Sequence, residues 1–112
     1  MAGTVEITND LCWMTQNWIH DNTLEVMAAI LKPNEAALAT RLLEARTFEN
    51  GGYLDLRPYD KETLATLSRA ADAAQKTFER EGARTFYAPE AYPGFMKRVE
   101  ELKEMLRAAV VN

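Results

Sequence analysis

The chain has 112 residues, of which 47% are hydrophobic and 27% charged, so it has the length of one domain and the composition of a globular protein. Seventeen acidic and thirteen basic residues give a formal net charge of −4, and the sequence has no basic run, which argues against nucleic acid as a partner. It holds no signal-peptide pattern, no apolar stretch near the roughly 20 residues that cross a bilayer, and a single cysteine, so we expect a cytoplasmic protein without membrane contact.

The first twenty residues fit two interpretations. Residues 3–8 alternate between apolar and polar like a strand, and the two polar residues after them act either as a helix cap or as a hairpin turn. A helix over 10–20 gathers three apolar side chains on one face, namely Leu11, Met14 and Trp18. We favour this helix, because a strand would place Thr15 among apolar residues, and we expect Trp13 either to be partly exposed or to hold on to a neighbouring residue.

Two further helices are predicted before residue 50. Either Asn22 or Thr23 caps the first of them, and Pro33 ends it. Its inward side chains are Leu24, Met27, Ala28 and Leu31. The second begins after the cap residue Asn34 and covers 36–46, where nearly all residues are strong helix formers. Its apolar stripe consists of Leu38, Leu42, Leu43 and Ala45.

The clearest helix of the chain is predicted over 61–81. Asp60 is its N-terminal cap and Gly82 its end, since glycine enters the left-handed conformation without a steric clash. Five residues with a period of 3.6 form its buried stripe: Leu64, Leu67, Ala71, Ala74 and Phe78. The last helix opens at Pro93 and carries a second such stripe of Phe95, Val99, Leu102, Leu106 and Ala109. We expect these two helices to pack together, because the alanines allow close approach.

Between the predicted helices, Gly51 and Gly52 break the chain, and residues 53–57 alternate like a short strand. Pairing of 53–57 with 3–8 would give a minimal two-stranded β-ribbon. The fold class that we expect is therefore mainly α, a single-domain bundle of four to five helices over residues 1–112, with this ribbon as its candidate β-structure.

Catalytic and metal-binding patterns are weak. Cys12 and His20 are the only thiol and the only imidazole, and on one helix they would lie about 12 Å apart, so we expect a buried cysteine and a helix-terminal histidine. His20-Asp21 resembles the paired metal ligands of the HD phosphohydrolases, but that site needs further histidines. We expect no cofactor, no metal and no enzymatic activity.

The remaining functional signal is a set of tyrosines and charged residues in the predicted connections. Tyrosine is enriched at protein interfaces because it buries a large area at a small entropic cost. The candidate partner-binding residues are Tyr53, Asp55, Tyr59, Asp60, Tyr87, Glu90 and Tyr92. The alternative is that these tyrosines lie at core margins with their hydroxyls in water.

A short, acidic, bacterial-type chain without a catalytic set is similar to the immunity proteins of toxin systems, a resemblance in properties and not in motifs. It implies a protein partner, such as a basic toxin or enzyme, whose active site is covered by acidic loops. The first alternative is a self-associating structural or regulatory domain, a homodimer joined through Trp13, Met14 and Trp18. The second is a small-ligand carrier or enzyme with a pocket between helices.

Overall fold

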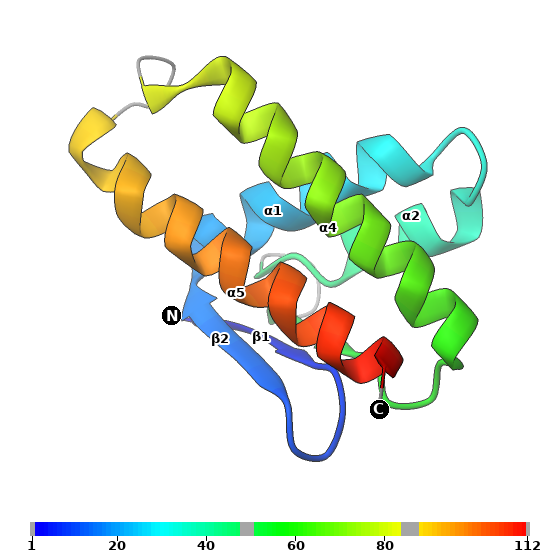
Figure 1. Cartoon of the computed structure of the whole chain (residues 1–112). Coiled ribbons are helices and arrows are strands. Elements are labelled where there is room, and N and C mark those ends of the chain that lie inside the picture. The colour runs from blue at the N-terminus through cyan, green and yellow to red at the C-terminus, as the bar shows by residue number, and fades with distance from the viewer. Residues whose placement is uncertain (1, 48–50, 84–87, 112) are drawn as a thin grey trace.

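In the computed structural model, which describes residues 2–47, 51–83 and 88–111, four α-helices pack on a small three-stranded sheet (Figure 1). The strands are β1 (Ala2–Glu6), β2 (Cys12–Gln16) and β3 (Tyr53–Asp55). The helices are α1 (Asn17–Leu31), α2 (Ala36–Glu44), α4 (Lys61–Glu81) and α5 (Tyr92–Val111), and one 3-10 turn, η2 (Pro89–Ala91), precedes α5. The predicted mainly helical fold class is confirmed.

The sheet has the strand order β2-β1-β3. β1 runs antiparallel to β2, with Val5 opposite Trp13, and parallel to β3, with Val5 opposite Leu54. The predicted pairing of 53–57 with 3–8 is therefore confirmed. The third strand, β2, occupies residues for which a helix was predicted.

The predicted helix over 10–20 is wrong, and a turn accounts for the difference. The Thr8 hydroxyl accepts hydrogen bonds from the backbone N–H groups of Asp10 and Leu11, both at 3.1 Å, and closes a hairpin between β1 and β2. Strand alternation then buries Thr15. Trp13 is also buried, at 1% exposure, so the first alternative for it, partial exposure, is wrong. The second alternative is confirmed, since the Trp13 Nε1–H donates to the Arg98 carbonyl at 2.9 Å.

The hairpin also moves the start of the next helix. α1 begins at Asn17, ahead of either predicted cap residue, and Gln16 takes the N-cap position without a capping hydrogen bond from its side chain. The predicted inward side chains of this helix are confirmed, since Leu24, Met27, Ala28 and Leu31 are all buried.

The prediction for α4 is confirmed at both ends. Asp60 Oδ1 accepts the Thr63 N–H at 2.8 Å, and Gly82 ends the helix at a φ of 75°. All five residues of the predicted α4 stripe and all five of the predicted α5 stripe are buried. The two helices pack side by side, and Phe78 meets Phe95 edge to face with ring centroids 4.7 Å apart (Figure 1).

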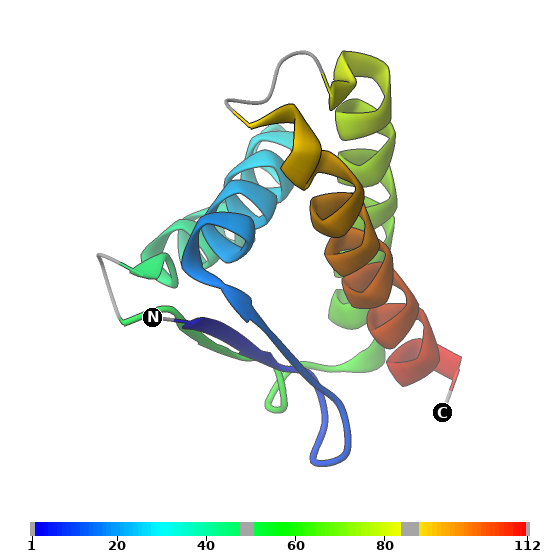
Figure 2. The same cartoon turned by 90° about the vertical axis from the view of Figure 1, so that its left-hand side faces the viewer.

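The helices all lie on one side of the sheet (Figure 2). The side chains of the strands and their flanks that point toward the helices are buried, and include Val5, Ile7, Trp13, Leu54 and Leu56. We call this side the inner face. No described helix crosses the opposite side, which we call the outer face.

Candidate functional site

The outer face carries two rows of side chains that the register of the strands defines. In the first row Thr4 of β1 lies between Met14 of β2 and Tyr53 of β3. Met14 is 59% exposed and Tyr53 43% exposed. Antiparallel sheets with one free face normally turn polar residues outward, so two large, partly apolar side chains in one row mark a candidate interaction surface.

The second row is ionic. Glu6 of β1 lies between Cys12 and Asp55, and Arg57 just after β3 binds both carboxylates. Its Nε and Nη2 donate to the two oxygens of Asp55 at 2.8 and 3.0 Å, and its Nη1 lies 3.3 Å from Glu6 Oε2. Two carboxylates and one guanidinium leave this row with one negative charge.

The two rows are joined by the hydroxyl of Tyr53, which donates to Glu6 Oε1 at 3.2 Å. Partial desolvation, followed by the negative charges of Asp55 and Glu6, raises the pKa of Tyr53 above its ordinary value. The hydrogen bonds from Arg57 hold the pKa of Asp55 below its ordinary value. At neutral pH the outer face therefore presents an ionised Asp55 in the ionic row and a neutral Tyr53 phenol in the row beside it.

Four of the predicted partner-binding residues lie between the start of β3 and the start of α4. Tyr53 and Asp55 are on the outer face. Tyr59 is half-buried against the core, and Asp60 is used as the α4 cap, where hydrogen bonds from Thr63 lower its pKa. Of these four residues, only Tyr53 and Asp55 therefore belong to the outer face.

The other predicted residues lie elsewhere. Glu90 is in η2 and Tyr92 starts α5, beside the C-terminal end of α4 (Figure 1). The Tyr92 hydroxyl donates to the Phe78 carbonyl at 3.3 Å. Tyr87 lies outside the described residues. The structure thus does not bring Glu90 and Tyr92 together with the outer-face residues.

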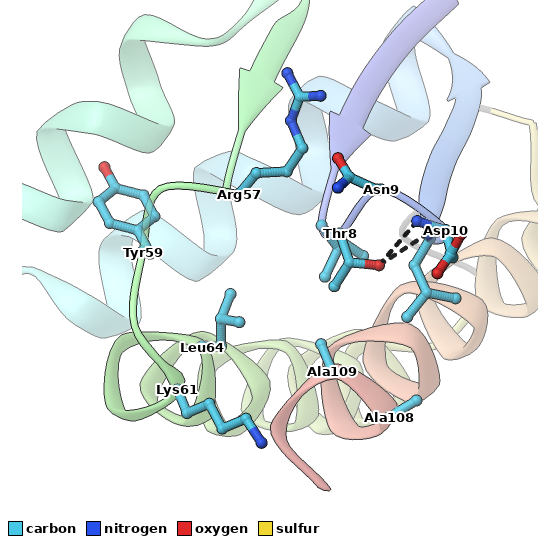
Figure 3. Close-up of a pocket in the computed structure, with 11 residues that line it drawn as sticks. Thr8, Asn9, Asp10, Arg57, Tyr59, Lys61, Leu64, Ala108 and Ala109 are labelled. Carbon is cyan, nitrogen blue, oxygen red and sulfur yellow. Dashed lines mark hydrogen bonds between the residues drawn. The ribbon is translucent and has the colours of Figure 1, made fainter. Parts of the chain in front are cut away.

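An open groove of about 530 Å³ lies beside the hairpin (Figure 3). Leu64 of α4 and Ala109 of α5 line its helical side, and Tyr59 and Lys61 line another part of its wall. Arg57 also lines it but turns its guanidinium away, toward β1 and β3 (Figure 3). The groove has a mixed lining of apolar and polar side chains and lies next to the ionic row.

The candidate nucleophile and base are separated by the sheet. Cys12 is exposed on the outer face, so the predicted burial of this cysteine is wrong, because strand alternation turns residue 12 outward. Partial desolvation and the charge of Glu6 raise its pKa, which disfavours the thiolate. His20 is fully buried on the inner side, in the first turn of α1, and stacks on Trp13 with ring centroids 6.2 Å apart.

A hydrogen-bond network that the sequence did not reveal surrounds His20. Its Nδ1–H donates to Asp21 Oδ1 at 2.9 Å, and Asp21 also accepts the N–H and the hydroxyl of Thr47 at 3.0 and 2.6 Å. Burial alone would raise the pKa of Asp21, but the bonds from Thr47 and His20 outweigh it and lower the pKa. The network ties α1 to the segment after α2, and His20 Nε2 is left buried without a partner.

Two residues of the candidate surface, Thr4 and Met14, are not among the predicted partner-binding residues, although Met14 belongs to the predicted surface of the alternative homodimer. The signal that identifies them is strand alternation, since Met14 points outward once Trp13 points inward. Within residues 2–47, 51–83 and 88–111, no three His, Cys, Asp or Glu side chains cluster as metal ligands, and no helix has the length and apolarity needed to cross a membrane. Comparison with family models, with curated proteins and with solved structures finds no match to this chain.

Proposed function

We propose that this chain is a small cytoplasmic protein-binding module of the immunity or inhibitor type, which covers a basic surface of a partner protein with the outer face of its sheet. The observation that carries the proposal is the row formed by Met14, Thr4 and Tyr53 on a sheet face that no described helix covers. It is bordered by the ionic row of Glu6, Asp55 and Arg57.

The contacts of Tyr53 favour binding. Tyrosine and methionine are enriched in interface cores, and the bond to Glu6 already restrains the ring, so less side-chain entropy is lost when a partner docks. Arg57 holds the two carboxylates in place in the same way. The net charge of −4 speeds the encounter with a basic protein.

Occlusion, and not catalysis, is the mode of action that we propose. The only histidine is buried under the inner face and the exposed cysteine is disfavoured as a thiolate, so these two residues do not form a nucleophile and base pair. Occlusion needs only shape and charge on the outer face.

The proposal is tested by affinity purification with three baits. These are the wild-type chain, the double variant Met14→Ala/Tyr53→Ala, and the control Ile30→Ala, which removes an exposed apolar side chain of α1. We expect a partner that the wild type and the control recover and the double variant loses. Equal recovery by all three baits would exclude the outer face.

The recovered partner then tests the charge argument. Calorimetric titration at rising salt should show affinity falling, because screening weakens attraction between an acidic module and a basic surface. An affinity that does not depend on salt would contradict the basic character of the partner.

Self-association is the second candidate function, and Met14 and Trp18 favour it. Trp18 is 37% exposed and Met14 is 59% exposed, whereas Trp13, the third residue of the predicted dimer surface, is buried. Sedimentation separates the two functions, since a stable dimer at micromolar concentration supports self-association and a monomer supports the binding module.

A further inference from the structure

The methionines of the described part of the chain differ sharply in their access to water. Met27 of α1 is buried, and Met96 and Met105 of α5 are partly buried against the core. Met14 lies exposed on the outer face of the sheet. A small oxidant dissolved in water therefore reaches the Met14 sulfur in the folded protein, whereas it reaches the Met27 sulfur only when the fold opens.

The position of Met14 couples its sulfur to the candidate surface. Met14 is the middle residue of β2 and lies opposite Thr4 of β1. The Thr4 N–H donates to the Gly52 carbonyl, so Thr4 turns its backbone groups toward β3 and forms no backbone bond with Met14. In antiparallel sheets the side chains of such a pair lie close together. Because Tyr53 flanks Thr4 on its other side, a partner that covers this row also covers the sulfur.

A peroxide is the class of oxidant that fits this site. The sulfur lone pair forms a bond to one oxygen of hydrogen peroxide, the O–O bond breaks, and the other oxygen leaves as water with the proton of the transferred oxygen. The sulfur loses two electrons and the peroxide gains them. The product is a sulfoxide, which is polar where the thioether was apolar.

The change in polarity acts on the surface that a partner would cover. A sulfoxide oxygen binds water, and its burial in an interface without a hydrogen-bond donor is unfavourable. We propose that Met14 is an oxidation site for peroxides, and that conversion of its thioether to the sulfoxide releases the partner from the outer face. The release rests on the proposed function, whereas the selective oxidation of Met14 does not.

Cys12 is the other sulfur of the outer face, two residues from Met14 along β2. Thiols are oxidised through the thiolate. Partial desolvation and then the charge of Glu6 raise the pKa of Cys12, so its thiolate is scarce. A thioether has no proton to lose. Acid therefore suppresses the reaction of Cys12 and leaves Met14 reactive, which allows the two sulfurs to be separated by pH.

The oxidation site is tested without any partner. The wild type and Cys12→Ser are treated with limiting hydrogen peroxide at about pH 5, well below the ordinary pKa of a thiol, and mapped by peptide mass spectrometry. Among the four described methionines, Met14 should gain an oxygen atom first in both proteins. Earlier oxidation of Met27, Met96 or Met105 would overturn the proposal.

Reversal and stability complete this part of the test. Methionine sulfoxide reductases for the two sulfoxide epimers, with a dithiol as reductant, should restore the original mass, since the oxygen leaves as water and the dithiol becomes a disulfide. The urea midpoint of the singly oxidised protein should equal that of the untreated one, because the side chain is exposed. A lower midpoint would mean that oxidation damages the fold, and would overturn release through the surface.

The release is tested with the partner that the wild type recovers. Calorimetric titration should show an affinity about tenfold lower or more for the oxidised protein, and reductase treatment should restore it. The matched control is Met14→Leu, which keeps an apolar side chain and has no sulfur at this position. Whatever the affinity of this variant, peroxide should not change it.

The outcomes separate the two proposals. Equal affinity of the oxidised and the untreated wild type would overturn the release and leave the proposed function intact. An equal loss in Met14→Leu after peroxide would assign the effect to another residue and would also overturn it. If the wild type recovers no partner, the proposed function and the release fail together, and the mapping alone decides whether Met14 is an oxidation site.

Discussion

The two faces of the sheet are built from alternate residues of the same strands, yet their surroundings are opposite. Trp13 on the inner face is 1% exposed, and Met14 beside it on the outer face is 59% exposed. The inner face therefore contributes stability through burial, whereas the outer face can be changed at little cost to folding. Because the two faces are separate in this way, residues on the outer face can be selected for binding without a loss of stability.

Among the substitutions that test this comparison, Trp13→Ala should have the largest effect on stability. Trp13 fills the inner face and its Nε1–H donates to the Arg98 carbonyl within α5, so its loss leaves a cavity and removes this hydrogen bond between β2 and the helix. We expect a loss of about 3–5 kcal/mol in the free energy of unfolding, measured by urea denaturation. Met14→Ala, one residue along, should change it by less than about 0.5 kcal/mol. Similar losses in both variants would contradict the assignment of faces.

A smaller but more local test is Gly3→Ala. A Cβ at Gly3 would lie 2.1 Å from Cγ of the buried His20, so the imidazole must move and its contacts with Trp13 and Asp21 are disturbed. We expect a loss of about 1–3 kcal/mol, the usual cost of overpacking.

The matched control for this substitution is Gly94→Ala. Position 94 lies in the first turn of α5 with open space around it, and the same change should stabilise the protein by about 0.5 kcal/mol. Destabilisation at both glycines would show that the contact with His20 is not the cause.

The sequence predicts α4 well because everything that defines it is local. The period of the stripe, the Asp60 cap and the Gly82 stop lie within the helix or next to it. Residues 10–20 are different, since the nine residues between Asp10 and His20 are too few to decide between the helical and the strand period. The turn at Thr8 and a hydrogen bond from Trp13 to Arg98, 85 residues away, decide the outcome.

The candidate surface was predicted only in part, because some of its residues are brought together by contacts between segments that are distant in sequence. Tyr53 and Asp55 were identified from residue type and their place in a connection. Met14 and Thr4 join them only through the pairing of three strands that are distant in sequence. Residue type was thus enough to indicate that a surface exists near Tyr53 and Asp55. Only the tertiary structure shows which other residues belong to it.

The inner side also holds a carboxylate, that of Asp21, whose loss should lower the free energy of unfolding. The substitution Asp21→Asn tests this expectation. Asp21 accepts hydrogen bonds from His20 and Thr47, and its replacement at neutral pH should cost about 1–2 kcal/mol. Its pKa in the folded state is below its unfolded value of about 3.9. The stabilisation is therefore complete above that value and is lost as the pH falls through the folded pKa.

Urea denaturation of the wild type and Asp21→Asn between neutral and acidic pH measures this dependence. The difference in the free energy of unfolding between the wild type and Asp21→Asn should become smaller at acidic pH. A difference that stays constant down to pH 2 would mean that the charge of Asp21 contributes nothing.

The smallest effect is expected on the outer face, from Tyr53→Phe. Among the described residues, the exposed hydroxyl binds Glu6 alone, so the urea midpoint at neutral pH should not change measurably. Since the folded-state pKa of Tyr53 is raised, the contribution of this phenol is present below its unfolded value of about 10 and is lost as the pH rises through the folded one. Absorbance titration should show one tyrosine that ionises late in the wild type and is missing in the variant. A partner bound through the outer face would make this difference larger, because docking excludes water from the same hydroxyl and makes its ionisation harder still.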